Sequence, residues 1–328
     1  MKRITLLVLI LLVVAIPATH ARSGYRIQVK FTELKDTMVY LAHYYGKPLP
    51  TIYKTDSARF DSKGVAILES KEETLGGIYM LLLSDKQTYF EFLLNDGDEM
   101  SITASTQNLP ESVKFKGSPE NERFQAYVKF LREFGARQQA LQQSLENAKT
   151  AADSAQIREE ITTHGKALIA YRKDYAGKYP KTLLANIFRA LEVPQIPEGT
   201  HYLPDGKVDS SFAYKYYKAH YWDGFDFTDD RLIHTPIYDG KLDEYFNKIV
   251  VPVPDSITRE GDSLLAKTRG RKELFKYTLW WLARNTESSK IMGMDQAFVY
   301  FVEQYILRGD AYWLDHEGVE RYRERISK

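Results

Sequence analysis

The stretch from residue 220 to residue 236 is the best candidate for chemistry in this sequence. It reads HYWDGFDFTDDRLIHTP and holds four aspartates and two histidines beside a tryptophan and a tyrosine. Carboxylates and imidazoles together can bind a transition metal, and paired carboxylates can act as general acid and base. The stretch therefore raises two chemical hypotheses, an oxygen-and-imidazole metal site and a carboxylate-dependent hydrolase.

A structural interpretation of the same stretch competes with both hypotheses. Asp229 and Asp230 are suited to the cap and first turn of a helix, where negative charge is favoured by the helix dipole. Trp222, Phe225 and Phe227 would anchor the loop in an apolar core. We favour this interpretation, and we predict no catalytic residue, no metal ligand and no cofactor for the chain.

Other catalytic motifs are missing from the sequence. It contains no G-x-S-x-G, no H-E-x-x-H, no P-loop and no Rossmann glycine pattern, and it has no cysteine at all. Thiol catalysis is therefore excluded. Asp315, His316 and Glu317 are adjacent and would point in different directions on a helix, which favours a surface charge cluster.

The composition narrows the classes of partner. The chain has 45 basic and 44 acidic residues, so no broad field favours nucleic acid or an anionic membrane. Tyrosine is abundant, with 23 copies, and tyrosine suits contacts with polysaccharides and peptides. The segment from Tyr214 to Trp222 is rich in it. The candidate binding residues are three aromatic residues of this segment and the two aspartates that follow it: Tyr214, Tyr217, Trp222, Asp223 and Asp226.

The first 21 residues predict export. Lys2 and Arg3 precede an uncharged run of thirteen residues, ITLLVLILLVVAI, and small residues stand at the positions that favour cleavage after Ala21. This is the layout of a secretory signal peptide, and the run is short for a membrane-spanning helix. No cysteine follows it for lipid attachment, so we expect a periplasmic protein without stable membrane insertion after cleavage.

Residues 22–117 predict an antiparallel β sandwich or barrel. Tyr25, Ile27, Val29 and Phe31 alternate with polar residues, and similar segments separated by turn residues follow up to Phe115. About seven strands are expected. The acidic turn at 95–99 resembles the start of a calcium loop but fails the twelve-residue spacing, so a hairpin turn is expected there.

Residues 118–328 predict an all-helical domain. Ser118 and Pro119 mark a helix start with a capping serine. Two long apolar series then recur every three or four residues, which predicts an antiparallel hairpin of two long helices. His164 falls on its seam and is expected to be a packed residue. Shorter helices follow, and the chain as a whole is expected to be an α+β protein of two units, each burying its own core.

Several of these segments resemble a known family. HYWDGFDFTDDRLIHTPIYDGKLDEYFNKIV, SKIMGMDQAFVYFVEQY and AYWLD are similar to the helical domain of exported bacterial thioredoxin-like proteins. GYRIQVKFTELKDTMVYLAHYYGK, FLLNDGDEMSITAS and FKGSPEN resemble the β-rich domain that precedes it in that family. There a thioredoxin or peroxidase-like domain with a C-x-x-C pair comes last. This sequence ends near where the linker to it would begin, so the two cysteines have no counterpart.

The resemblance implies a non-catalytic accessory role. The chain would bind or position partners for thiol–disulfide exchange carried out elsewhere, either a thioredoxin-like domain or a periplasmic protein substrate. The alternatives are a periplasmic or surface module that binds glycans or peptides, and the carboxylate-dependent hydrolase. In the favoured case the 220–236 stretch belongs to a non-catalytic domain.

Overall fold

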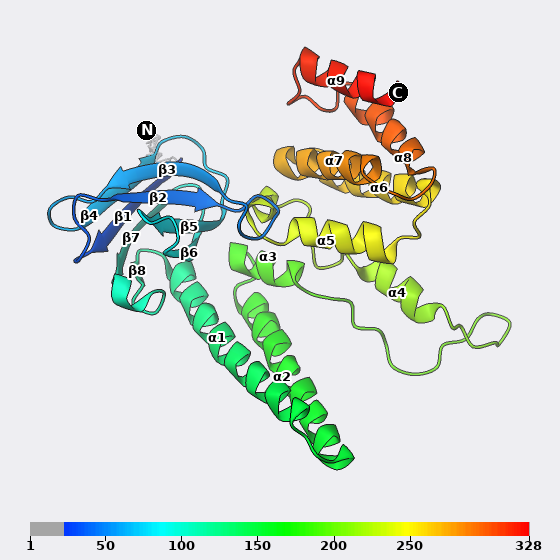
Figure 1. The fold of residues 1–328 in the computed structure, drawn as a ribbon, viewed down its shortest axis with the longest axis horizontal. Coiled ribbons are helices and arrows are strands. Elements are labelled where there is room, and N and C mark those ends of the chain that lie inside the picture. The colour runs from blue at the N-terminus through cyan, green and yellow to red at the C-terminus, as the bar shows by residue number, and fades with distance from the viewer. Residues whose placement is uncertain (1–22, 328) are drawn as a thin grey trace, which may run out of the picture.

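The computed structural model describes residues 23–327, and the expected signal peptide lies outside these residues. A β domain and a helical domain follow one another along the chain, and a long helical hairpin projects from the place where they meet (Figure 1). The fold is therefore α+β, as the two periodicities predict. No helix within residues 23–327 has the length and apolarity that a membrane span requires.

The β domain consists of two four-stranded sheets, with the strand orders β4-β1-β7-β8 and β3-β2-β5-β6. Neighbouring strands are antiparallel except for β1 and β7, which run parallel. The eight strands of the described region are β1 Tyr25–Phe31, β2 Met38–His43, β3 Tyr53–Arg59, β4 Val65–Ser70, β5 Gly77–Leu83, β6 Tyr89–Leu94, β7 Asp98–Ala104 and β8 Lys114–Lys116.

The alternating sequence of β1 has the expected effect. Tyr25, Ile27, Val29 and Phe31 are all buried in the sandwich core. The turn after β6 differs from expectation, because β6 and β7 belong to different sheets and do not pair. Asn95–Asp98 is therefore a connection between the sheets and not a hairpin turn.

The helical domain begins with two long helices and continues as a compact body of short ones. α5 and α8 each run on into a π-helical segment. The helices are α1 Pro119–Glu146, α2 Ala151–Lys178, α3 Leu183–Ala190, α4 Phe212–His220, α5 Tyr238–Glu244, α6 Pro254–Thr268, α7 Lys272–Glu287, α8 Met294–Phe301 and α9 His316–Ile326. The short segments are η1 Thr106–Asn108, η2 Asp230–His234, η3 Tyr245–Ile249 and η4 Val302–Ile306.

The hairpin of α1 and α2 has the predicted form, with one correction at its start. Ser118 occupies the N-cap of α1 but makes no capping hydrogen bond, because its hydroxyl accepts from Asn121 instead. At the start of α2, Thr150 does cap, accepting from the Asp153 amide. His164 is packed as expected, with its ring 4.0 Å from that of Phe134.

Strand β5 carries the packing between the two domains. Its sequence GIYMLLL is buried at every position, because both faces of the sheet are covered at this strand. One side chain set enters the sandwich core and the other joins the core of the helical domain. The first set is Tyr79, Leu81 and Leu83, and the second is Ile78, Met80 and Leu82. The helical core therefore extends onto the outer face of the β3-β2-β5-β6 sheet, and the two cores are not independent.

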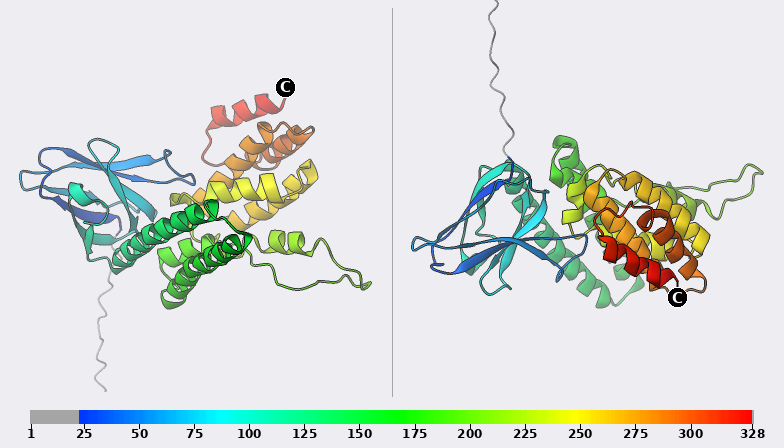
Figure 2. Two further views of the ribbon diagram at one scale, coloured as in Figure 1. Left: turned by 60° about the horizontal axis from the view of Figure 1, so that its bottom comes forward. Right: turned by 90° about the horizontal axis from the view of Figure 1, so that it is seen from above.

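Backbone contacts tie the domains together at one place, which we call the domain seam. The Gly46 amide donates to the Ile233 carbonyl at 2.6 Å, and the Asp239 amide donates to the Gly46 carbonyl at 3.0 Å. Gly77 has a φ of +155°, and a Cβ built there would lie 2.2 Å from the Cβ of His234. Glycine is required at this position because the neighbouring domain occupies the space of a side chain. Figure 2 shows the two domains side by side in both views.

Candidate functional site

The carboxylates of the 220–236 stretch serve the fold in two ways. Asp229 caps the η2 turn and holds the Arg231 guanidinium at 2.8 Å. Burial opposes ionisation of Asp229, but hydrogen bonds and the charge of Arg231 outweigh it, so the pKa of Asp229 is lowered. This carboxylate is ionised, and its oxygens accept hydrogen bonds from Arg231 and Asn186.

Asp230 caps a helix that is distant in sequence. Its carboxylate accepts from the backbone amides of Glu273 at 3.0 Å and Leu274 at 2.8 Å. These amides lie in the first turn of α7, where they have no partner within the helix. Asp230 lies in the first turn of η2, as the sequence predicts, and its carboxylate in addition attaches η2 to α7.

The aromatic residues of the stretch anchor it, as predicted. Trp222, Phe225 and Phe227 are buried in the helical core and contact one another. The indole Nε1 of Trp222 is the one buried side-chain nitrogen or oxygen in the described residues without a hydrogen-bond partner. Gly224 lets this turn approach α3, because a Cβ there would lie 2.2 Å from the Arg189 carbonyl oxygen.

The remaining polar candidates do not converge. Asp223 accepts from or shares a proton with His220 Nδ1 at 2.6 Å, and both side chains are exposed. Asp226 accepts from the amide and hydroxyl of Thr228, as in a local turn. His234 lies at the domain seam, where its ring stacks on that of His43 with the centroids 3.8 Å apart. Within residues 23–327, no group of three or more histidine and acidic side chains is arranged to hold a metal ion.

The two tyrosine candidates have structural contacts. Tyr214 is half exposed, and its hydroxyl donates to the Ile249 carbonyl at 2.9 Å. Tyr217 packs against the helical core. Tyr216, immediately before Tyr217, lines a cavity, and the sequence pattern alone did not single it out.

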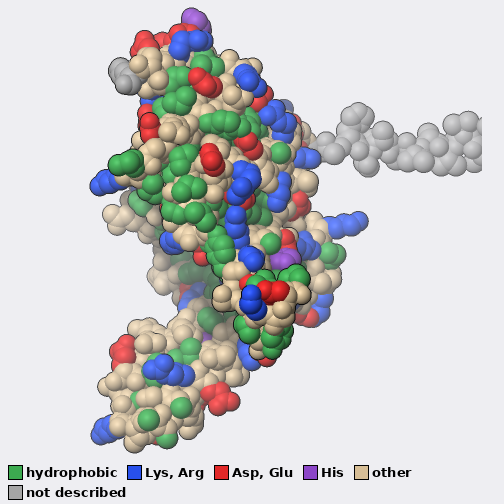
Figure 3. Space-filling model, turned by 90° about the vertical axis from the view of Figure 1, so that its right-hand side faces the viewer, with side chains coloured by type: hydrophobic (Ala, Val, Ile, Leu, Met, Phe, Trp, Pro, Cys, Tyr) green, Lys and Arg blue, Asp and Glu red, His purple; other side chains and the backbone are tan. Residues whose placement is uncertain are grey.

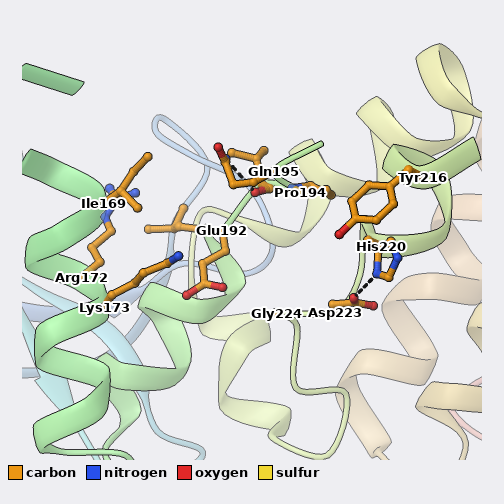
Figure 4. A pocket seen from close by; sticks show the side chains of 12 residues that line it. Ile169, Arg172, Lys173, Glu192, Pro194, Gln195, Tyr216, His220, Asp223 and Gly224 are labelled. Carbon is orange, nitrogen blue, oxygen red and sulfur yellow. Dashed lines mark hydrogen bonds and ion pairs between the residues drawn. The ribbon is translucent and has the colours of Figure 1, made fainter. Parts of the chain in front are cut away.

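That cavity is a pocket of about 310 Å³ between α2, the segment after α3, and α4. Figure 4 shows Arg172 and Lys173 on one wall and Tyr216, His220 and Asp223 on the other. The apolar part of its lining consists of Ile169, Leu191, Val193 and Pro194. The pocket therefore combines charges of both signs with an apolar surface and an aromatic ring.

Two charged side chains of this pocket make no polar contact with the rest of the described chain. The side chains of Lys173 and Glu192 make no hydrogen bond or ion pair to any described residue, and in Figure 4 the Lys173 side chain points toward Glu192. Arg172 is held in place, because its Nε donates to the Tyr127 hydroxyl at 2.9 Å. Sequence reasoning missed the α2 residues because α2 and α4 meet only through the tertiary fold.

The outer surface of the helical domain shows no broad patch of one charge on the face drawn in Figure 3. Acidic and basic side chains alternate there among hydrophobic ones, and the hairpin forms a separate lobe below. This agrees with the balanced composition of the chain.

Comparison with known families divides the chain into two matches. Residues 25–124 match a domain of unknown function, DUF4369. Residues 147–328, more than half of the chain, match a second domain of unknown function, DUF5106. No curated protein matches the chain.

Proposed function

We propose, for a chain that belongs to the DUF5106 family, a non-catalytic role as the partner-binding region of an exported, periplasmic protein. The partner would take part in thiol–disulfide exchange, either as a thioredoxin-like domain or as its protein substrate. The resemblance to the non-catalytic domains of thioredoxin-like proteins supports this proposal, as does the absence of cysteine from the chain.

The observation that carries the proposal is the pocket between α2 and α4. Its uncommitted Lys173 and Glu192 lie beside an apolar surface, and a polypeptide offers both charges and apolar side chains. By contrast, three of the four aspartates that suggested catalysis, Asp226, Asp229 and Asp230, hold turns or helix ends. Asp229, whose pKa is lowered, is poorly suited to act as a general acid. The carboxylate of Asp230 is occupied by two backbone amides of α7.

Calorimetric titration with a purified thioredoxin-like domain tests the proposal. We expect saturable binding of the domain in its oxidised or reduced form, and at least tenfold weaker binding by the Lys173→Glu variant. Lys166→Glu is the matched control, because Lys166 lies exposed on the same helix outside the pocket. Absence of binding, or an equal loss in the control, would contradict the proposal.

A second candidate function is recognition of a free peptide or glycan in the same pocket. The specific observation is Tyr216, whose ring lies 4.2 Å from the His220 ring and lines the pocket. Peptide and glycan arrays distinguish the two functions, because only the second predicts binding to isolated ligands. Tyr216→Ala should then abolish the array signal, while Tyr202→Ala, at an exposed loop tyrosine, should leave it unchanged.

A further inference from the structure

The turn that leads into α8 exposes a methionine almost completely. Met292 is 96% exposed, the largest value among the large hydrophobic side chains of residues 23–327. The residue does not line the pocket of the proposed function. Its surroundings are therefore a separate feature of the helical domain.

The backbone of residues 291–294 accounts for this exposure. The Met294 amide donates to the Ile291 carbonyl at 3.2 Å, and Gly293 has a φ of +82° and a ψ of −3°. These values are those of the third residue of a type II β-turn, a position that favours glycine because other residues are strained there. Met292 is the second residue of the same turn, and its side chain extends into solvent.

The other methionines of the described region are covered. Met294, two residues later, begins α8 and is only 4% exposed, because it packs in the helical core. Met80 and Met100 are buried, and Met38 is partly buried in β2. Met292 is therefore the one thioether within residues 23–327 that a dissolved reagent reaches freely.

An exposed thioether has a characteristic chemistry, which is oxidation to the sulfoxide. Thiols are the other sulfur groups of proteins that react with oxidants, and this chain has no cysteine. No thiol of the chain therefore competes with the thioethers for an oxidant. Among these thioethers, exposure decides which one reacts first.

We propose that Met292 is a modification site, at which peroxides convert the thioether to a sulfoxide while the buried methionines stay reduced. A lone pair of the sulfur forms a bond to one peroxide oxygen, and the O–O bond breaks. With hydrogen peroxide, the leaving hydroxide takes up a proton and departs as water. The sulfur loses two electrons and the peroxide gains them, so one peroxide is consumed for each sulfoxide.

The modification changes an apolar corner of the helical domain. A Cβ built at Gly293 would lie 3.9 Å from Pro254 Cγ, so the turn adjoins the start of α6. Val251 and Val253, just before Pro254, are also exposed. A sulfoxide is polar, whereas a thioether is apolar. Oxidation of Met292 therefore places a polar group at this corner without disturbing the core.

Peptide mapping by mass spectrometry, after treatment of the folded chain with hydrogen peroxide at neutral pH, tests the inference. Met292 and Met294 are close enough to fall in one peptide, and fragmentation of that peptide assigns the added oxygen to one sulfur or the other. We expect Met292 to be oxidised at least about tenfold faster than Met294. In concentrated urea the two rates should become similar, because burial then protects neither residue.

Two variants complete the test. Met292→Leu should remove the fast uptake of oxygen by this peptide, and Met294→Leu, a volume-conserving change in the core, is the matched control that should retain it. Single oxidation of the parent protein should shift the melting temperature by no more than about 2 °C, since the side chain is exposed.

Four results would overturn the inference. Met294 could react as fast as Met292 in the folded chain, or the preference for Met292 could persist unchanged in urea, so that the fold is not its cause. Met292→Leu could retain the fast step. Finally, a large fall in melting temperature after single oxidation would show that the modified side chain belongs to the core.

Discussion

The domain seam and the α1–α2 hairpin are both lined by apolar and aromatic side chains, yet they are built very differently. In the hairpin, two regular helices contact each other and most of the distal half is exposed. At the seam, the outer face of the sheet is covered along β5, and the absence of a side chain at Gly77 leaves room for His234 of the other domain. The difference teaches that the β domain is part of the core of the helical domain, while the hairpin is an appendage of it.

The largest expected effect comes from removing the β domain. A fragment of residues 118–328 exposes the helical side chains that pack on Ile78, Met80 and Leu82. We expect it to bind the dye ANS and to lose its cooperative thermal transition, because an exposed apolar face of this kind is not tolerated in a stable fold. A cooperative transition with helical circular dichroism and no dye binding would show instead that the seam is dispensable.

A residue whose described ring contacts all lie between residues 221 and 245 supplies the reference effect. Trp222 is buried among aromatic rings, so Trp222→Ala should reduce the free energy of unfolding by about 3 to 5 kcal/mol. Trp222→Phe should cost much less, since it removes a buried N–H that has no partner. Urea unfolding of both variants provides the measurement, and equal losses would contradict the packing argument.

Two substitutions by alanine, one at each place, compare the seam with the hairpin directly. Met80 is fully buried at the seam, and Met80→Ala should cost about 2 to 5 kcal/mol. Leu145, near the tip of the hairpin, is only partly buried, and Leu145→Ala should cost about 1 kcal/mol or less. Urea midpoints of the two variants test this order. A larger loss for Leu145→Ala would mean that the hairpin is integral to the core.

The seam should also respond to pH. Burial, and then the neighbouring His43, lower the pKa of His234 to about 3, below the value of about 6.5 in an unfolded chain. The unfolded state therefore binds more protons between these values, and stability falls as the pH drops below about 6.5. We expect a loss of about 1 kcal/mol between pH 7.5 and 5.5. His234→Phe should show a smaller loss in urea titrations at the two pH values, and an unchanged loss would rule out His234 as the cause.

The smallest expected effect is that of Asp223→Ala. The side chain is exposed, and its one described hydrogen bond is with His220. Surface substitutions of this kind usually change the free energy of unfolding by about 0.5 kcal/mol or less. A chelator should not lower the melting temperature of the parent protein, and a drop that disappears in Asp223→Ala would show a metal site in the 220–236 stretch.

The same contrast explains what the sequence can predict. Within the hairpin and β1, the periodicity of apolar residues shows which face is buried, because the whole pattern lies within one regular helix or strand. In β5 the run GIYMLLL shows that both faces are buried, but not which domain covers the outer one. The parallel pairing of β1 with β7 joins residues 73 positions apart, and no local pattern encodes it.

The candidate site shows the same limit. Trp222, Phe225 and Phe227 were predicted as anchors because apolar residues follow a general rule of burial. The role of Asp230 could not be predicted, because the helix it caps begins some forty residues later. Lys173 and Tyr216 lie on different helices, and only the fold brings them to one pocket.

The close approach of Gly77 to His234 also constrains how this chain can change over generations. The two positions fall in different matched regions, 25–124 and 147–328. Each region therefore supplies one of the two residues that must fit together at the seam. A β domain taken from a relative with a larger residue in place of Gly77 would not seat on this helical domain. We expect the two regions to be inherited as a pair, and substitutions at position 77 to be accompanied by a change at position 234. Exchanging whole segments between relatives and counting the folded hybrids would reveal that joint inheritance.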